Sequence, residues 1–474
     1  MSLLDLSRWQ FAITVMFHMT FPAITVGLSI FLSVVYGVYW RTGRPVYLQM
    51  FRFWRRIFAV GFAIGVVAGA VITFQMGLNW GVYGARTGPI IGPIIGMEVV
   101  TAFFVEAGFI GVLLYGEERV RKSTMFLSTV MVALGTILSS TWIIAANSWM
   151  QTPAGFKIVH GRFEPTDWVR VIFNPSFIWR WPHMLTAVLI SAAFFIAGIS
   201  AWYLVKGRAK GFARRSMSMA LGVAALLMPV QLYLGDAVAG HELPHQLSKL
   251  EAIEGNWNNG NTGFVLFSVP DQEAARNIAE LNIPCLGSAI AKDLTCDTAM
   301  PGLKLTPAAD RPDMAATFWG FRVMFLAAVL MFGTVFAATV LRMRNRLWTA
   351  RRFHRFVLWT TPAGILAILG GWVTAEAGRQ PWIVFGQLRT SDAVSHLAPG
   401  EVLFSVIGFS ALYLFMLLAY IAYILRTMRI GPERDDPRHD PPPDLPGTDS
   451  ARFAEVPGPR KVSEPLVSQE VTTR

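Results

Sequence analysis

Nine apolar stretches, each about as long as a bilayer core is thick, recur along the 474-residue chain. A helix needs about 20 predominantly apolar residues to cross the hydrocarbon. The candidate spans cover residues 11–38, 55–79, 94–115, 124–148, 183–205, 217–235, 316–341, 355–376 and 402–426. Only 15% of the residues are charged, whereas soluble domains carry about 25%. The sequence therefore predicts an all-α polytopic membrane protein with these nine transmembrane helices.

Basic residues occupy alternate loops between the spans. Lys and Arg gather at 41–56, 119–122, 206–215 and 342–355, which are the first, third, fifth and seventh loops. Because loops rich in Lys and Arg stay in the cytoplasm, the N-terminus is predicted outside and the C-terminus inside. This distribution also accounts for the net charge of +11, so a nucleic-acid partner is not expected.

The sixth loop, residues 236–315, is predicted to lie on the extracytoplasmic side. It carries eleven Asp or Glu and five Lys or Arg. Its two cysteines, Cys285 and Cys296, could form one disulfide if the loop faces an oxidising compartment. The chain thus divides into a membrane domain, 1–430, and a polar, proline-rich tail, 431–474, which is predicted to be disordered in the cytoplasm.

Five polar or sulfur-containing residues from five spans are predicted to share one level in the outer part of the bilayer. They are His18, Glu98, His183, Met324 and Glu376. His and Met are axial haem ligands, and a carboxylate can serve as a weaker ligand. Taken singly, each residue has a plainer interpretation: a hydrogen-bonded His, a packed Met, or a Glu paired with an arginine. Only their common level favours a cofactor.

Two arginines and a second acid extend this set. Arg322 and Arg379 lie close in sequence to Met324 and Glu376, and a guanidinium suits a haem propionate. Glu106 follows Glu98 by eight residues, which predicts roughly the same helix face about 12 Å deeper. Two acids in line suggest a proton path across the membrane, with an interhelical hydrogen bond as the alternative.

Several longer strings resemble subunit I of the cytochrome bd quinol oxidases. They are SRWQFAITVMFHMTFP (7–22), FQMGLNW (74–80), MEVVTAFFVEAGFIG (97–111), AANSWMQTPAG (145–155), SKLEAIEGNW (248–257), FRVMF (321–325) and GWVTAEAGRQPW (371–382). The resemblance extends to the end of the ninth span. It implies oxidation of quinol at the outer face, reduction of dioxygen to water, and a proton gradient made without pumping.

The resemblance also implies a low-spin haem b, a high-spin haem b and a haem d. His183 and Met324 match the ligands of the low-spin haem, and Arg322 and Arg379 match arginines near haem propionates. At the oxygen site, His18 and Glu376 match iron ligands and Glu98 matches the acid beside haem d. Family members differ in which haem each of these positions holds.

Other matching positions concern electrons, protons and substrate. Trp372 matches a tryptophan between haems, and Glu106 matches an acid of the proton path. In the sixth loop Lys249 and Glu254 match residues tied to quinol oxidation. Without the resemblance, both loop residues would be interpreted as solvated charges.

Only 75 residues separate Lys249 from Met324, so the chain resembles the short-loop branch that includes the cyanide-insensitive oxidases. The implied partners are a second large membrane subunit and, in some members, a very small third one. The implied location is the bacterial cytoplasmic (inner) membrane, with the sixth loop on the periplasmic side.

Two alternative functions stay open. A b-type cytochrome serving another acceptor would need only His183 and Met324, and a proton-coupled transporter would show inverted repeats, of which the sequence has no sign.

Overall fold

The structure is a computed structural model that describes residues 2–260, 263–284 and 300–432. Within these ranges, nine helical segments are long and apolar enough to cross a membrane. The predicted all-α polytopic class and number of spans are therefore confirmed. Cys285, Cys296 and all but the first two residues of the predicted tail, 431–474, lie outside the described residues.

Each predicted span lies within a longer helical segment, except that the span predicted at 55–79 extends one residue past the end of α3. The segments are α1 (Leu3–Thr20) with α2 (Pro22–Thr42), α3 (Pro45–Leu78), α4 (Gly81–Glu98) with α5 (Phe104–Tyr115), α6 (Lys122–Gln151), α8 (Phe177–Lys206), α9 (Lys210–His245), α12 (Met314–Met343), α13 (Arg351–Trp359) with α14 (Ala363–Ala377), and α15 (Pro399–Ile430). The added turns carry polar and basic residues, which hydropathy alone assigns to loops.

The third span begins much earlier than predicted. Its predicted start was residue 94, but the helix runs from Gly81. Arg86, Pro89 and Pro93 weaken the apolar signal of this stretch, yet the helix continues through both prolines. Prolines are tolerated in membrane helices because neighbouring groups satisfy the freed carbonyls.

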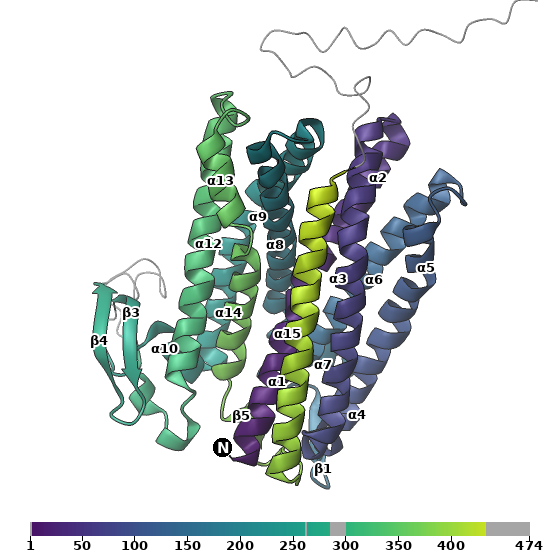
Figure 1. Ribbon diagram of the computed structural model, residues 1–474. Coiled ribbons are helices and arrows are strands. Elements are labelled where there is room, and N and C mark those ends of the chain that lie inside the picture. Colours follow the sequence, from purple (N-terminus) through teal and green to yellow (C-terminus); the bar gives the residue numbers. More distant parts are fainter. Residues whose placement is uncertain (1, 261–262, 285–299, 433–474) are drawn as a thin grey trace, which may run out of the picture. The chain divides into compact units, whose positions relative to one another are not determined.

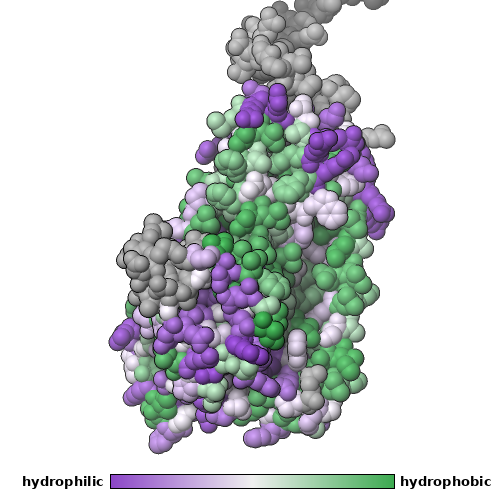
Figure 2. Space-filling view, turned by 90° about the vertical axis from the view of Figure 1, so that its left-hand side faces the viewer, coloured by the Kyte–Doolittle hydropathy of each residue, from purple (hydrophilic) through white to green (hydrophobic). Residues whose placement is uncertain are grey.

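The helices run side by side in a bundle, and the chain's short loops alternate between its two ends (Figure 1). The turns after α2, α5, α8 and α12 lie at one end, which carries the basic loops. The N-terminus and the start of α15 lie at the other end. On the face in Figure 2, hydrophobic side chains occupy the middle of the bundle and hydrophilic ones gather towards its ends. Which end faces the cytoplasm stays a prediction.

The end that carries the N-terminus also holds the short elements of the chain. They are the hairpin of β1 (Phe156–Val159) and β2 (Arg162–Pro165), α7 (Trp168–Ile172), α10 (Leu247–Glu254), the hairpin of β3 (Phe264–Asp271) and β4 (Arg276–Ile283), and β5 (Trp382–Val384) with β6 (Leu388–Arg389). The predicted sixth loop, 236–315, was too long, because α9 continues to His245 before the turn into α10.

Helices α12 and α14 approach each other at a pair of glycines. A Cβ atom on Gly370 would lie 2.7 Å from the carbonyl oxygen of Gly320 and 3.0 Å from the backbone nitrogen of Met324. Small residues let membrane helices pack closely, because van der Waals contact rather than water exclusion holds them together. This contact fixes the backbone of Met324 against α14.

Replacing Gly370 with Val should therefore push α12 and α14 apart. We expect a loss of about 1–3 kcal/mol of stability, the usual cost of overpacking, seen as a lower midpoint of thermal unfolding in detergent. Gly333 of α12 is the matched control, because an added Cβ there would meet no atom within 4 Å. Equal midpoints for Gly370→Val and Gly333→Val would contradict the close contact.

Candidate functional site

Glu376 lies in the last turn of α14 and is held by three side chains. Its Oε1 atom accepts hydrogen bonds from Asn147 at 3.0 Å and from Gln151 at 3.3 Å. Its Oε2 atom is ion-paired with Arg379, whose side chain is almost fully buried. Asn147 and Gln151 are four residues apart on α6, so both amides project from one face of that helix. The carboxylate is thus fixed at the end of the bundle that carries α10.

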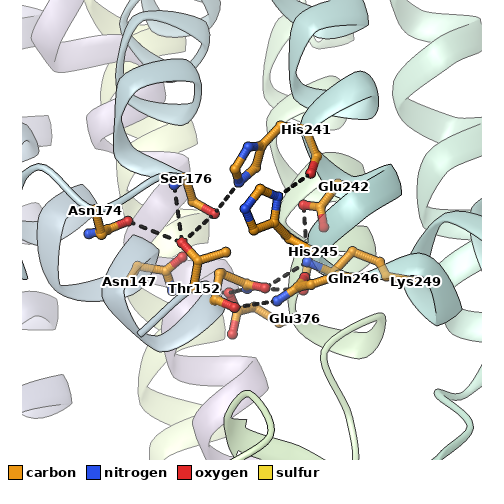
Figure 3. A network of polar contacts seen from close by, with 12 residues as sticks. Asn147, Thr152, Asn174, Ser176, His241, Glu242, His245, Gln246, Lys249 and Glu376 are labelled. Atoms are coloured by element: carbon orange, nitrogen blue, oxygen red, sulfur yellow. Dashed lines mark hydrogen bonds and ion pairs between the residues drawn. The ribbon is translucent and has the colours of Figure 1, made fainter. Parts of the chain in front are cut away.

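Lys249 of α10 is buried close to Glu376 and Glu242 (Figure 3) and shares Gln151 with Glu376. Only 2% of it is exposed, and its Nζ atom lies 2.6 Å from Gln151 Oε1 and 3.2 Å from Glu242 Oε1. Its stem packs on Gly378, where an added Cβ would lie 2.5 Å from Lys249 Cγ. Burial lowers the pKa of Lys249 to about 8, although Glu242 acts in the opposite direction. The interpretation of Lys249 as a solvated charge is therefore wrong.

Glu254 faces a different side of α10. Five residues separate it from Lys249, which is about 140° around a helix. Burial raises the pKa of Glu254, while the nearby Arg322 guanidinium lowers it. The Oε2 atom of Glu254 is buried without a hydrogen-bond partner in the described part of the chain. Two predicted substrate residues therefore belong to separate polar groups on one short helix.

Arg322 of α12 joins the sixth loop to the bundle. It donates from Nε to the Val265 carbonyl at 2.6 Å and from Nη1 to the Ile253 carbonyl at 3.0 Å. Its guanidinium also lies 4.1 Å from the ring centroid of Phe318. The Nη2 atom is buried and has no partner among the residues that the structure describes.

His183 lies on α8 and Met324 on α12, two helices that both pack against α9 and α14. Gln231 of α9 places its Nε2 atom 3.3 Å from both ring nitrogens of His183 on α8. Met324 of α12 faces α14, where a Cβ on Gly371 would lie 2.8 Å from its sulfur. Trp372 follows Gly371 directly. Helices α8, α9, α12 and α14 form a ring in which each packs against two of the others, and the three predicted residues lie in this four-helix region.

His18 lies near the end of α1 and faces α3. Its Nδ1 atom lies 3.1 Å from the carbonyl oxygen of Gly65. A Cβ on Gly69, one turn further along α3, would lie 3.2 Å from His18 Cε1. The imidazole therefore lies against two glycines on one face of α3. Its Nε2 atom has no hydrogen bond among the described residues and could bind a ligand.

Glu98 and Glu106 both face α6, so the two acids lie on one side of their segment, as the spacing of eight residues predicts. Ser139 donates to Glu98 at 2.7 Å, and a Cβ on Gly135 would lie 2.5 Å from Glu106 Cγ. In a regular α-helix residues eight apart diverge by about 80°. Here a π-helical segment, Val99–Phe103, lies between the acids. One extra residue lengthens two turns from about 7.2 to about 8.2 residues, which brings the two carboxylates into line.

The predicted acids do not share a single level. Contacts to α6 give the relative positions of the acids along the bundle. Glu376 contacts α6 at residues 147 and 151, and Glu98 contacts it at residue 139. Eight to twelve residues of helix correspond to about 12–18 Å. Glu98 lies deeper than predicted because its helix starts at Gly81. The predicted sites therefore descend from Glu376 through Glu98 to Glu106.

Comparisons with known proteins cover nearly the whole chain. Residues 6–432 match the family model described as cytochrome bd terminal oxidase subunit I. The chain belongs to this family. It is 33% identical to the cytochrome bd ubiquinol oxidase subunit 1 of Bacillus subtilis, over 93% of this chain and 97% of the relative. It is 32% identical to the cytochrome bd-II ubiquinol oxidase subunit 1 of Escherichia coli, over 90% and 97%. The bd oxidase structure from Geobacillus thermodenitrificans superposes with a TM-score of 0.83 at 28% identity, over 91% of this chain and 99% of that one.

A cytochrome bd subunit needs groups that can hold haem, and the described residues suit that need. Buried guanidinium nitrogens without a partner in the described ranges occur on Arg180, Arg322 and Arg379. Such donors suit the carboxylates of haem propionates. Glycines keep space beside the predicted iron ligands: Gly69 beside His18 and Gly371 beside Met324, with Gly235 opposite His183. The residues therefore fit haem, while the role of each stays a proposal.

Four residues of this region were not predicted. They are Asn147, Gln151, Arg180 and Glu242. The spacing of Asn147 and Gln151, both within the string at 145–155, is a helical-face signal that could have identified them. Glu242 was assigned to the loop because hydropathy ended the helix at residue 235. Arg180 lies near enough to Glu376 and Glu242 to interact with both.

The ion pair between Glu376 and Arg379 should be a strong stabilising contact. Replacing Arg379 with Gln leaves a buried carboxylate without its charge partner, for which we expect a cost of about 3–5 kcal/mol. Arg389→Gln is the control, because the Arg389–Asp310 pair is about one-third exposed and such pairs contribute about 0–1 kcal/mol. Thermal unfolding in detergent measures both, and equal losses would contradict the assignment.

Proposed function

We propose that this chain is the haem-bearing subunit of a terminal quinol:dioxygen oxidoreductase. Membership of the cytochrome bd subunit I family supports the oxidase activity, and the relatives named as ubiquinol oxidases support quinol as the electron donor. The observation that carries the proposal is the group of buried arginines around Glu376, His183 and Met324 whose N–H donors have no partner among the described residues.

The proposed haem set is a low-spin haem b, a high-spin haem b and a haem d. Bound haem would supply one-electron transfer and the reduction of dioxygen. His183 and Met324 would hold the low-spin haem b, and His18 and Glu376 the other two. Arg322 and Arg379 would bind propionates with the N–H groups that have no partner in the described chain. Glu98 would lie beside haem d, and Trp372 would lie between haems.

The quinol site is proposed at α10. An ammonium has three N–H donors, of which Lys249 gives two to Gln151 and Glu242. The third can hold a quinol oxygen. Glu254 can accept a quinol proton, because its raised pKa makes the carboxylate a better base near neutral pH.

Protons for water would reach the oxygen site along α6. Glu98 of α4 and Glu106 of α5 both face α6, where Ser139 donates to Glu98 and Gly135 packs against Glu106. Because the acids are aligned by the π-helical segment, a proton can pass inward or outward between them along one face. With the predicted orientation this path opens towards the cytoplasm, while quinol protons leave on the periplasmic side.

The proposed partners and location follow the family. A second large membrane subunit would complete the oxidase, and a small single-span third subunit is compatible with the resemblance. The enzyme would lie in the bacterial cytoplasmic (inner) membrane with the sixth loop on the periplasmic side.

A reduced-minus-oxidised optical spectrum of the assembled complex tests the function. We expect b-type bands and a far-red chlorin band of haem d. In Met324→Leu the low-spin b-type band should be lost while the other bands persist, because Leu fills the site but cannot bind iron. Leu330, which is exposed on the same helix, offers a control in Leu330→Val.

Each result has a definite meaning. A normal low-spin band in Met324→Leu would exclude Met324 as a ligand. A spectrum with b-type bands alone in the fully assembled complex would remove haem d and favour an electron-transferring cytochrome. A folded complex without any haem band would contradict the whole ligand set.

The pKa of Lys249 predicts a pH dependence of quinol binding. Because this pKa is lowered to about 8, the ammonium that holds the quinol is present below pH 8 and is lost above it. The KM for quinol should therefore rise above pH 8, by up to about tenfold per pH unit. Steady-state oxygen consumption measures this, with Lys249→Met as the control, whose KM should be high and flat. A wild-type KM that does not change with pH would contradict a role for Lys249 in quinol binding.

A further inference from the structure

Gln151 is the junction between the outer loop and the end of α14. None of its surface is exposed. Its Oε1 atom accepts from Lys249 Nζ at 2.6 Å. Its Nε2 atom lies 3.3 Å from Glu376 Oε1 and 3.2 Å from the Ala375 carbonyl oxygen. Its backbone carbonyl accepts from Gln246 Nε2 at 2.5 Å. One residue of α6 thus contacts both the proposed quinol site and a proposed iron ligand.

The chemistry of the amide fits this position. A primary amide has an acceptor at one end and donors at the other. The acceptor end of Gln151 meets an ammonium, and the donor end meets a carboxylate. The contacts therefore run in one order, from Glu242 through Lys249 and Gln151 to Glu376 and Arg379. Reversing the amide would point its donors at Lys249 and its oxygen at Glu376, so the network permits one orientation.

The surroundings leave little freedom for rearrangement. Lys249 rests on Gly378, where an added Cβ would lie 2.5 Å from its Cγ. Gly378 lies two residues after Glu376, so the lysine touches the same turn that follows the carboxylate. Asn147, one turn before Gln151, makes a separate hydrogen bond to Glu376. Figure 3 shows Asn147 and Lys249 reaching the carboxylate region from different elements.

We propose that Gln151 is a positioning residue that couples the quinol-binding loop to Glu376. Through its amide, a displacement of Lys249 when quinol binds changes the hydrogen bonding of the Glu376 carboxylate. The inference rests on the proposed function, because it takes Lys249 as a quinol contact and Glu376 as an iron ligand. It adds that the two sites share one hydrogen-bonded side chain.

A double-mutant cycle in the assembled oxidase tests the coupling. The variants are Lys249→Met, Gln151→Leu and the pair, and the readouts are the quinol KM and the reduction midpoint of each haem by spectroelectrochemical titration. Lys249→Met should lower the midpoint of the haem held by Glu376, because a nearby positive charge is lost. That shift should fall by at least about half in the Gln151→Leu background, since coupled contacts are non-additive.

Gln151→Glu separates the two ends of the side chain and is nearly isosteric, so it serves if Gln151→Leu does not assemble. Glutamate keeps an acceptor for Lys249 but replaces the N–H donor at Glu376 with a second carboxylate oxygen, which repels the Glu376 carboxylate. We expect its quinol KM to stay within about twofold of the wild-type value, whereas Gln151→Leu raises KM about tenfold through loss of a hydrogen bond to a charged group. The reduction midpoint of the haem held by Glu376 should be shifted in both variants.

Asn147→Leu is the matched control. It removes the other amide donor to Glu376 while leaving Gln151 and Lys249 in place. The reduction midpoint of the haem held by Glu376 should shift in this variant. The further shift caused by Lys249→Met should keep its full size in this background. Equal midpoint shifts for Lys249→Met in wild-type and Gln151→Leu backgrounds would overturn the coupling. A normal quinol KM in Lys249→Met would instead overturn the proposed quinol role of Lys249, which distinguishes the two failures.

Discussion

An ionised side chain inside a membrane protein must receive its hydrogen bonds from the protein, because the hydrocarbon offers none. Glu376 shows how this constraint organises the structure. Its two oxygens are bound by Arg379 and by two amides of α6, so the last turn of α14 is fixed to α6. Lys249 joins the same group through Gln151, and α10 is thereby held against the bundle. The hydrogen bonding of one carboxylate thus helps to fix the position of the sixth loop.

Arg322 meets the same constraint on the other side of α10. Its guanidinium binds two loop carbonyls and leaves one N–H without a described partner. The short helix is therefore anchored on one face by a lysine and on the other by contacts to an arginine. This arrangement separates the two proposed quinol residues, so a substrate would have to approach α10 where both faces are within reach.

Much of the fold could be predicted from the sequence. A run of 20 apolar residues has few alternatives to a membrane helix, and all nine spans were identified correctly. The predicted helix ends were less accurate, because a hydropathy pattern does not show that a helix continues through Arg86, Pro89 and Pro93. Because the predicted helices were too short, Glu98 was placed too close to the end of its helix and Glu242 was assigned to a loop.

The candidate site could be predicted only in part. Residue types made His18, His183, Met324 and Glu376 candidates, since a charged or ligating residue in an apolar run is conspicuous. The partner of a buried group is harder to infer, because pairing depends on helix packing between distant segments. Gln151 and Lys249 are 98 residues apart in sequence, and no local pattern indicates that they touch.

The π-helical segment at Val99–Phe103 has a consequence for how this chain can vary. It contains one residue more than a regular helix needs between two acids that face α6. Any of its side chains can be exchanged without changing that count. Deleting one of its residues would restore a regular helix with the acids seven residues apart, which diverge by only about 20°. Keeping all the residues in a regular helix would instead turn Glu106 about 80° away from Glu98. The alignment of the acids therefore depends on the match between the length of this segment and its π-helical geometry.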